Sequence, residues 1–231
     1  MEPIICMSWN LLAQRYVCDE MLPWEQRSLL IEKEINATNP DILLLQEVTL
    51  DRCREDLSFL LARYDYVAHQ RCKKRTNFMG NVILWRRDSF TLCFSSQHYA
   101  EVSCRLKAVR GQEIDVTNVH LKGGLSGGLK ERTSQLSRLL ARIDYKNPYH
   151  IIGGDFNDDL LPGGQLTRML YKFDGLDEKR QSCWVNDCMW SFDYILTHGL
   201  TRLSFTCREI VGQIPNQEHP SDHLPVVLRF Q

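Results

Sequence analysis

The segment HIIGGDFND (residues 150–158) decides the fold, because it reads as a buried strand that ends abruptly in polar residues. Gly153 and Gly154 allow a tight turn or a close approach of another backbone. If the chain is still extended beyond them, Asp155 and Asn157 point to the same face. A carboxylate and an amide side by side suit a hard cation and a phosphate-bound water, and they suit a hydrophobic core badly. In isolation, the same residues are also typical of a β-turn.

The pattern of a strand that ends in polar residues recurs along the chain. Any one of these residues has an ordinary interpretation as a turn former, a surface residue or a hydrogen-bonded strand histidine. Their repetition indicates a site that several strands build at one rim of a sheet. The further strand ends carry Asn10, Glu47, Asn118 with His120, Asp193, and Asp222 with His223.

Hydrophobic periodicity predicts an α+β fold in which two β-sheets pack face to face with helices outside. Helices are expected at 24–37, with Leu29, Leu30, Lys33 and Ile35 toward the core, and at 129–143. Asp51 is expected to cap another helix through residue 61. The expected strands are 4–12, 41–48, an antiparallel meander over 64–109, 113–121, 150–155, 192–196, 203–211 and 224–230.

Composition describes an ordinary globular chain without a dividing linker. The 231 residues are 43% hydrophobic and carry a net charge of −1, so we expect one domain over residues 1–231. Nine cysteines without metal-binding spacing favour a reducing compartment over a disulfide framework. We see no signal peptide and no membrane span, and therefore expect a location in the cytoplasm or nucleus with no membrane partner.

Basic residues gather locally although the net charge does not indicate a nucleic-acid partner. A basic run is usually a solvated face, but it can also surround a site for an anionic substrate. The candidate substrate-binding residues are Arg71, Lys73, Lys74, Arg75, Lys122 and Arg132, together with Asn118 at its strand end.

The oxygen-rich part of this set suits Mg²⁺, with Mn²⁺ as an alternative. Glu47, helped by Asn10 and Asp222, could supply the few protein oxygens that Mg²⁺ takes, leaving positions for water and phosphate. No zinc motif, Walker loop, dinucleotide-binding motif or nucleophile elbow occurs in the sequence. The adjacent residues Ser221, Asp222 and His223 cannot form a catalytic triad by adjacency alone.

The remaining residues suit metal-assisted cleavage of a phosphodiester. Asp155 could accept a proton from the attacking water while Asn157 holds that water or a phosphate oxygen. His120 and His223 could donate hydrogen bonds to the non-bridging oxygens. Asp193 could fix the tautomer of His223 through the other ring nitrogen.

These motifs resemble, in their order, those of the endonuclease/exonuclease/phosphatase superfamily. They are SWN (8–10), LLQE (44–47), NVHL (118–121), GDFN (154–157), DYIL (193–196) and SDH (221–223), and they cover almost the whole chain. The resemblance implies a four-layer α/β/β/α sandwich of the DNase-I-like type with Mg²⁺ or Mn²⁺. It also implies Glu47, Asn10 and Asp222 as metal ligands and Asp155 and Asn157 as the pair that handles the water. His223 backed by Asp193, and His120, would contact the phosphate.

Within the superfamily the chain is most similar to the branch of the carbon-catabolite-repressor-type deadenylases, nocturnin and the Angel proteins. The segments MSWNLLAQ (7–14), PDILLLQEV (40–48) and HPSDH (219–223) carry this likeness. It implies a 3′–5′ exoribonuclease that acts on single-stranded RNA. The loop 158–164 departs from that branch, and the helix around Glu131 to Leu136 is similar to tyrosyl-DNA phosphodiesterases. A tyrosyl-DNA phosphodiesterase-like or cyclic-phosphate end-processing enzyme is therefore an alternative, and a catalytically silent binding module is another.

Overall fold

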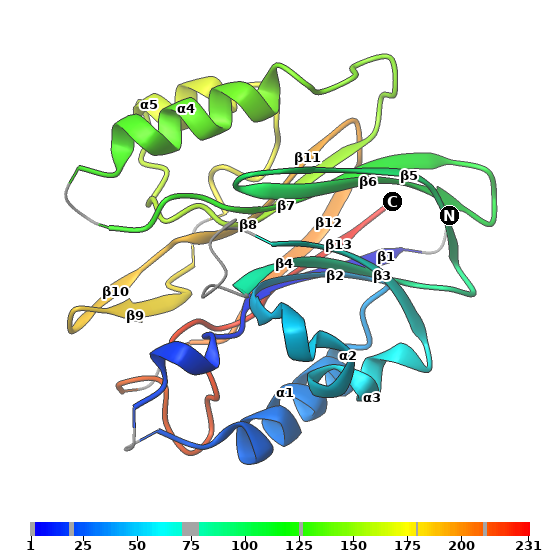
Figure 1. Ribbon diagram of the computed structural model, residues 1–231. Coiled ribbons are helices and arrows are strands. Elements are labelled where there is room, and N and C mark those ends of the chain that lie inside the picture. Colours follow the sequence, from blue (N-terminus) through cyan, green and yellow to red (C-terminus); the bar gives the residue numbers. More distant parts are fainter. Residues whose placement is uncertain (1–2, 19–20, 71–78, 125–126, 179, 210–211) are drawn as a thin grey trace.

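Two mixed β-sheets pack face to face, and helices cover their outer faces (Figure 1). The computed structural model describes residues 3–18, 21–70, 79–124, 127–178, 180–209 and 212–231. The four-layer α/β/β/α sandwich predicted from the sequence is confirmed. Among the described helices, none combines the length and the apolar character needed to cross a membrane.

The first sheet contains six strands in the order β12-β13-β1-β2-β4-β3. Strands β1 and β2 are parallel neighbours, whereas the other pairs are antiparallel. The bounds are β1 Ile4–Asn10, β2 Ile42–Thr49, β3 Tyr64–Gln70, β4 Met79–Arg86, β12 Arg202–Cys207 and β13 Val226–Phe230.

The second sheet contains five strands in the order β11-β8-β7-β6-β5, and its parallel pair is β7–β8. A separate two-stranded hairpin, β9–β10, extends beside the two sheets (Figure 1). The bounds are β5 Phe90–His98, β6 Glu101–Ala108, β7 Glu113–His120, β8 His150–Asp155, β9 Cys183–Val185, β10 Cys188–Trp190 and β11 Asp193–His198.

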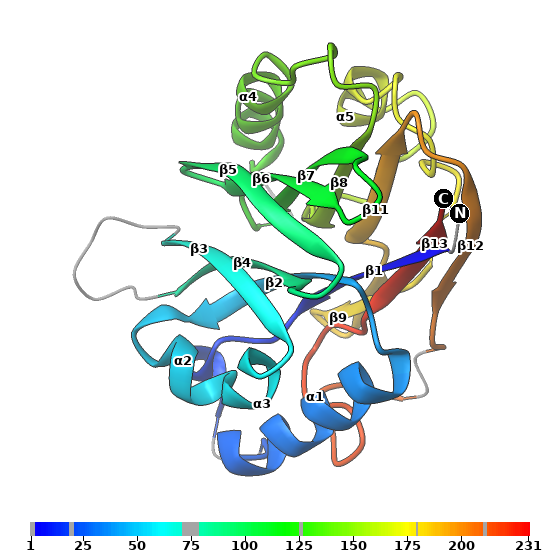
Figure 2. The ribbon, with the colours of Figure 1, turned by 90° about the vertical axis from the view of Figure 1, so that its right-hand side faces the viewer.

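The helices divide between the two outer faces, as the side view shows (Figure 2). The first sheet is covered by α1 Trp24–Thr38, α2 Cys53–Asp56 and α3 Ser58–Leu61, and the second by α4 Leu129–Leu140 and α5 Gln165–Met169. Short 3-10 helices, η1 Gln14–Tyr16 and η2 Leu50–Arg52, complete the set. Three apolar clusters follow from these layers: one between the sheets and one beneath each helical layer.

Two predictions about the first helical layer are wrong. The core-facing residues of α1 are Arg27, Ile31 and Ile35, whereas Leu29 is 64% exposed and Lys33 is exposed. The buried positions are spaced four residues apart, so the stripe passes through a charged side chain that the hydrophobic pattern overlooks. The helix predicted from Asp51 is broken into η2, α2 and α3, and no side chain caps these short helices.

The antiparallel meander predicted over residues 64–109 is also wrong in one respect. Strands β3 and β4 pair in the first sheet, and β5 and β6 pair in the second. The chain therefore crosses from one sheet to the other between Arg86 and Phe90. Local patterning cannot reveal this crossing, because both halves alternate in the same way.

Gly153 and Gly154 are required by close packing in the middle of the molecule. A Cβ atom at Gly153 would lie 2.5 Å from Cδ1 of Leu44 in the facing sheet. Gly154 has φ of +137°, and a Cβ atom there would lie 2.0 Å from the carbonyl oxygen of Val119 on the neighbouring strand. The glycine pair therefore lets β8 approach both β7 and the first sheet.

We expect Gly154→Ala to destabilise the protein by about 3 to 5 kcal/mol, because the methyl group meets a backbone oxygen that cannot move aside. Gly111→Ala is the matched control: its φ is +94°, but nothing lies within 4 Å of the added Cβ atom. That control should lose only about 1 to 2 kcal/mol for its backbone conformation. Urea unfolding of the two variants measures the difference, and equal losses would contradict the close-approach argument.

Candidate active site

The polar strand ends meet at one rim of the sandwich because of the strand directions. The parallel pair β1–β2 delivers Asn10 and Glu47 at its carboxyl end, and the parallel pair β7–β8 delivers His120 and Asp155. Strand β11 runs antiparallel to β8, so its first residue, Asp193, lies directly opposite Asp155 in the ladder. Strand β13 runs antiparallel to β1, which brings the segment before it to the same rim.

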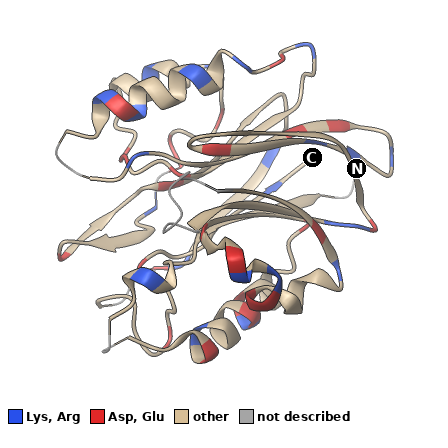
Figure 3. Cartoon of the chain, in the orientation of Figure 1, with Lys and Arg blue, Asp and Glu red and all other residues tan. Residues whose placement is uncertain are grey.

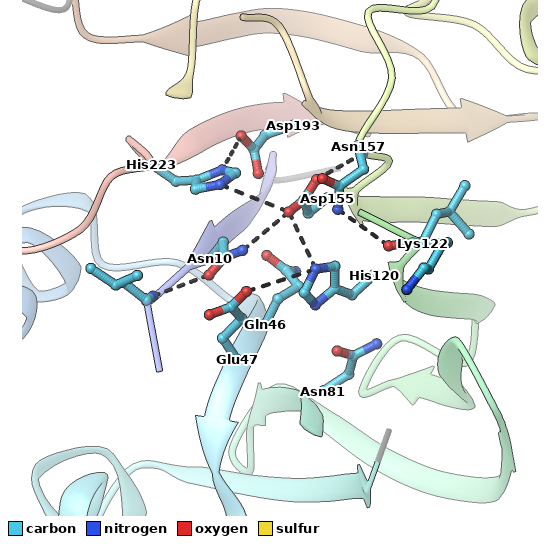
Figure 4. Close-up of polar contacts among 12 residues, drawn as sticks. Asn10, Gln46, Glu47, Asn81, His120, Lys122, Asp155, Asn157, Asp193 and His223 are labelled. Carbon is cyan, nitrogen blue, oxygen red and sulfur yellow. Dashed lines mark hydrogen bonds and ion pairs between the residues drawn. The ribbon is translucent and has the colours of Figure 1, made fainter. Parts of the chain in front are cut away.

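The residues that line the resulting cavity of about 370 Å³ include most of the predicted set. They are Asn10, Tyr16, Glu47, Met79, Tyr99, His120, Lys122, Gly123, Asp155, Asn157, Val185, Asp222 and His223. The structure thus brings together the predicted metal ligands, four of the five predicted catalytic residues and one predicted substrate-binding lysine. Asp193, the fifth catalytic residue, lies immediately behind His223 (Figure 4).

Asp155 lies at the centre of the polar network (Figure 4). Its Oδ2 accepts a hydrogen bond from Nδ2 of Asn10 at 3.1 Å. The same oxygen lies 3.5 Å from Nε2 of His120 and 3.8 Å from Nε2 of His223. Burial raises the pKa of Asp155, and the negative charge of Asp193 adds to this effect, whereas His223 opposes it. A carboxylate with raised proton affinity is suited to accept a proton.

Asp193 holds His223 in one orientation. Oδ2 of Asp193 lies 2.8 Å from Nδ1 of the imidazole and accepts a second hydrogen bond from Oγ of Ser182 at 2.6 Å. Burial alone would lower the pKa of His223, but the carboxylates of Asp193 and Asp155 outweigh burial and raise it well above its usual value. The pairing leaves Nε2 directed toward Asp155 and the cavity, as a proton donor to a bound phosphate would require.

Glu47 reaches the rim through a bulge rather than through regular alternation. The register between β2 and β4 shifts between Leu45 and Val48, and Glu47 has φ of +58°. This conformation is costly for a residue with a side chain, and such residues cluster at functional sites. Its Oε2 accepts a hydrogen bond from the backbone N–H of Ala13 at 2.9 Å, so the carboxylate has a fixed direction.

The predicted ligand set fits a divalent cation that prefers oxygen. Glu47 and Asp222 line one cavity together with Asn10. Burial raises the pKa of Glu47, and the negative charge of Asp222 raises it further. Two carboxylates that face one cavity are the arrangement that a divalent cation would stabilise. The side-chain oxygen of Asn10 also accepts a hydrogen bond from Leu12 N–H at 3.1 Å, which holds the amide in place.

Asn157 reaches the cavity by a turn and not by the extended strand that the sequence suggested. Strand β8 ends at Asp155, and Asn157 has φ of +50°. Its backbone N–H donates to Oδ1 of Asp155 at 2.8 Å, and its Nδ2 donates to the carbonyl of Leu121 at 3.2 Å. Asn157 therefore orients Asp155 as well as lining the cavity.

The prediction that Asn118 binds substrate is wrong, because its side chain is fully buried between the sheets. Its Nδ2 donates to the carbonyls of Leu45 and Val82 at 2.9 and 2.8 Å, and its Oδ1 accepts from Gln46 at 2.7 Å. Leu45 and Val82 are the last regular pair before the β2 bulge. Asn118 thus satisfies backbone groups at the bulge that presents Glu47.

Arg132 does not offer its charge to the cavity either. Its buried guanidinium donates to Oδ2 of Asp158 at 3.2 Å and to the carbonyls of Lys122 and Gly124 at 3.2 and 3.1 Å. It positions the loop that carries Lys122, and it joins that loop to the segment after Asn157. The basic residues Arg71, Lys73, Lys74 and Arg75 lie outside the described residues, and their predicted role stays a prediction.

Sequence reasoning missed Arg27, which anchors two segments of the rim. Its Nε donates to the carbonyl of Pro220 at 2.6 Å, and its NH2 donates to the carbonyls of Leu11 and Leu12. Burial lowers the pKa of Arg27 to about 10, although the carboxylates of Asp222 and Glu47 oppose this. The only signal in the sequence is its place four residues before Ile31 on the buried stripe of α1.

We expect Arg27→Met to destabilise the protein by about 3 to 5 kcal/mol, because three buried carbonyls lose a charged donor. Lys33→Met, on the exposed face of the same helix, should stay within about 0.5 kcal/mol of the parent. Chemical unfolding measures both changes. A loss at Arg27 no larger than the loss at Lys33 would contradict its role as an anchor.

Comparisons with known proteins agree with this geometry. The chain is 28% identical to mouse Nocturnin over 286 residues, an alignment that covers 99% of this chain and 66% of its relative. The chain therefore spans a little under two thirds of that protein's length. The structure superposes on ANGEL2, a 2′,3′-cyclic phosphatase, with a TM-score of 0.76 and 17% identity, covering 99% of this chain and 95% of that one.

A third similar structure is TDP2 from D. rerio in complex with a single-strand DNA product. The TM-score is 0.76 at 16% identity, and both chains are covered completely. These two structural likenesses concern the fold. The model of the endonuclease/exonuclease/phosphatase family matches residues 7–223, which include every polar strand end described above. The chain therefore belongs to the endonuclease/exonuclease/phosphatase family.

Proposed function

We propose that this protein is a Mg²⁺-dependent phosphodiesterase that acts on single-stranded nucleic acid, as a 3′–5′ exoribonuclease of the deadenylase type. One observation carries the proposal: Asp155 lies within hydrogen-bonding or ion-pairing reach of Asn10, His120 and His223, beneath a cavity that Glu47 and Asp222 also line. Membership of a family of phosphate-ester hydrolases and the similarity to Nocturnin support it.

The side chains suit an in-line attack of water on phosphorus. Asp155 takes the proton of the attacking water, and Asn10 and Asn157 keep its carboxylate in position. His223 donates from Nε2 to a phosphate oxygen while Asp193 holds its Nδ1. When bound by Glu47, Asn10 and Asp222, Mg²⁺ would supply Lewis-acid stabilisation of the charge that develops on the phosphate.

Two exposed tyrosines support a single-stranded substrate. Tyr16 is 48% exposed and Tyr99 is 57% exposed, and both line the catalytic cavity. Tyr16 belongs to η1 after β1 of the first sheet, whereas Tyr99 lies in the turn between β5 and β6 of the second. Unstacked bases bind aromatic side chains regardless of sequence, and a duplex does not offer such faces. In the part of the chain that Figure 3 colours by charge, Lys and Arg alternate with Asp and Glu along the elements.

We expect the purified protein to shorten labelled oligo(A) from its 3′ end with Mg²⁺ and to be inactive in EDTA. Asp155→Asn should lower kcat by about 10² to 10⁴-fold, because it removes the proton acceptor. Glu47→Gln should cost at least a similar factor through loss of a metal ligand. Asp51→Asn, at an exposed position outside the cavity, is the matched control and should leave kcat unchanged.

The same assay includes other homopolymers, single-stranded DNA, 5′-tyrosyl DNA and RNA with 2′,3′-cyclic phosphate ends. Cleavage restricted to the modified ends would assign the protein to end processing, which is the alternative function. The modified ends are included because the chain shares its fold with ANGEL2 and TDP2. Failure to cleave any of these substrates with either Mg²⁺ or Mn²⁺ would refute the proposal and leave a binding module.

We expect Tyr16→Ala and Tyr99→Ala each to raise KM for oligo(A) by about five- to a hundredfold, the range that corresponds to one base–aromatic stack. Neither substitution should change hydrolysis of an abasic oligonucleotide of the same length, which has no aromatic base to stack. Tyr171→Ala, at an exposed position outside the cavity, is the control. Equal effects on oligo(A) and on the abasic oligonucleotide would show that the tyrosines support the fold rather than a base.

A further inference from the structure

A buried thiol lies directly behind the catalytic histidine. The ligand atoms of Cys183, Asp193 and His223 all lie within 4.8 Å of one another, and all three residues are buried. Cys183 shares a face of β9 with Val185, which lines the catalytic cavity, but Cys183 itself is fully buried.

Backbone pairing fixes this arrangement. Cys183 and His223 are opposite each other in an antiparallel bridge, and Trp184 N–H donates to the carbonyl of Asp222 at 2.9 Å on one side of it. On the other side, Leu224 N–H donates to the carbonyl of Ser182 at 2.6 Å. Directly opposed residues in such a bridge hold their side chains close together. The thiol is therefore held beside the imidazole by a bridge with two backbone hydrogen bonds.

One carboxylate oxygen of this cluster has no partner. Oδ2 of Asp193 accepts from His223 and Ser182, whereas Oδ1 is buried without a hydrogen-bond partner among the described residues. A buried carboxylate oxygen without a partner destabilises the folded state, and a proton, water or ion bound to it would remove that cost. Burial raises the pKa of the Cys183 thiol, so a nucleophilic or redox role does not suit it in the absence of a metal.

We propose that Cys183, Asp193 and His223 form an inhibitory site for a thiophilic divalent cation of the Zn²⁺ class, distinct from the oxygen-lined Mg²⁺ site at the rim. A thiolate, an imidazole nitrogen and a carboxylate oxygen are the ligands that Zn²⁺ takes, with one position left for water. Mg²⁺ avoids sulfur, so the two sites select different metals although His223 is common to the cluster and the cavity.

Occupancy of the cluster would stop catalysis by moving His223. Zn²⁺ holds its ligands at about 2.0 to 2.3 Å in a tetrahedron, which places ligand atoms roughly 3.4 to 3.6 Å apart. Nδ1 of His223 now lies 2.8 Å from Asp193 Oδ2, in a hydrogen bond that the metal replaces. The cluster must therefore rearrange around the ion, and Nε2 leaves its place near Asp155. Two protons balance the binding: the thiol proton of Cys183 and the Nδ1 proton of His223 pass to solvent.

The test measures metal binding without relying on activity. In a parent chain with Cys18, Cys72, Cys93 and Cys188 replaced by Ser, Cd²⁺ is titrated in excess Mg²⁺, and thiolate-to-metal charge-transfer absorption is recorded. We expect one equivalent of signal, and the same signal in Glu47→Gln, which alters only the rim site. The signal should vanish in Cys183→Ser, whose hydroxyl can still donate to the carbonyl of Trp190 as the thiol does. An unchanged signal in Cys183→Ser would overturn the proposal.

Should Cys183→Ser fail to fold, Cys183→Ala and Asp193→Asn in the same parent provide the decision. Loss of the signal in the first and at least about tenfold weaker Cd²⁺ binding in the second support the site, since a metal loses at least that much affinity when its ligand sphere is damaged. Cd²⁺ binding that neither substitution changes refutes it.

The inhibitory role of the metal site rests on the proposed function, so its test uses the phosphodiesterase activity proposed above. In saturating Mg²⁺, Zn²⁺ should inhibit the wild-type protein, and Cys183→Ser should raise the half-inhibitory Zn²⁺ concentration at least about tenfold. Cys188→Ser, at an exposed position on the partner strand of the hairpin, should leave that concentration unchanged. Equal inhibition of wild type and Cys183→Ser would refute the inhibitory role. If no phosphodiesterase activity is found, the proposed function fails, and the Cd²⁺ titration still decides the metal site.

Discussion

The site depends on the alignment of three neighbouring strands in the second sheet. In the register of β7, β8 and β11, His120 lies opposite Asp155, and Asp155 lies opposite Asp193. A shift of one residue in either pairing would turn these side chains to the other face of the sheet. The close approach of Gly154 to Val119 helps to hold this register, because a side chain at that position would push β8 away from β7.

The first sheet contributes to the same rim through polar contacts that cross the sandwich. Asn118 and Gln46 form a hydrogen-bonded bridge between the sheets, beside the apolar cluster that also lies between them. A buried amide without partners would destabilise the fold, but here Asn118 satisfies two carbonyls at the β2 bulge. The bridge therefore ties the position of Glu47 to the packing of the two sheets. Chemistry at the rim and stability between the layers share the same residues.

Opposing charges are concentrated at the rim of the sandwich, where several of them are buried. His223 lies between Asp155 and Asp193, while Glu47 and Asp222 face one cavity and their charges act on the guanidinium of Arg27. Such a cluster stabilises the folded state poorly by itself, because the charged groups lose hydration. It is suited instead to hold protons, a cation and a phosphate in defined places. The buried thiol of Cys183 adds a soft ligand to this cluster, and it makes the same histidine accessible to a different class of metal.

The sequence alone determined the layer architecture and the chemical character of the site. Polar residues at the ends of apolar strands stand out against local expectation, and this contrast is enough to identify Asn10, Glu47, Asp155 and His223. The hydrophobic periodicity of α1 wrongly predicted that Leu29 faces the core. The buried residue is the charged Arg27, whose burial depends on carbonyls far away in the sequence.

Only the tertiary structure decided which polar residues face the cavity and which support it. Asn118 and Arg132 have the residue types of substrate ligands, but their partners come from other strands and loops, and these partners bury them. Tyr16, Tyr99 and Cys183 have no distinguishing local pattern, and they acquire their places through the meeting of separate elements. The local sequence shows which chemical groups a residue offers, whereas long-range packing determines which partners its side chain contacts.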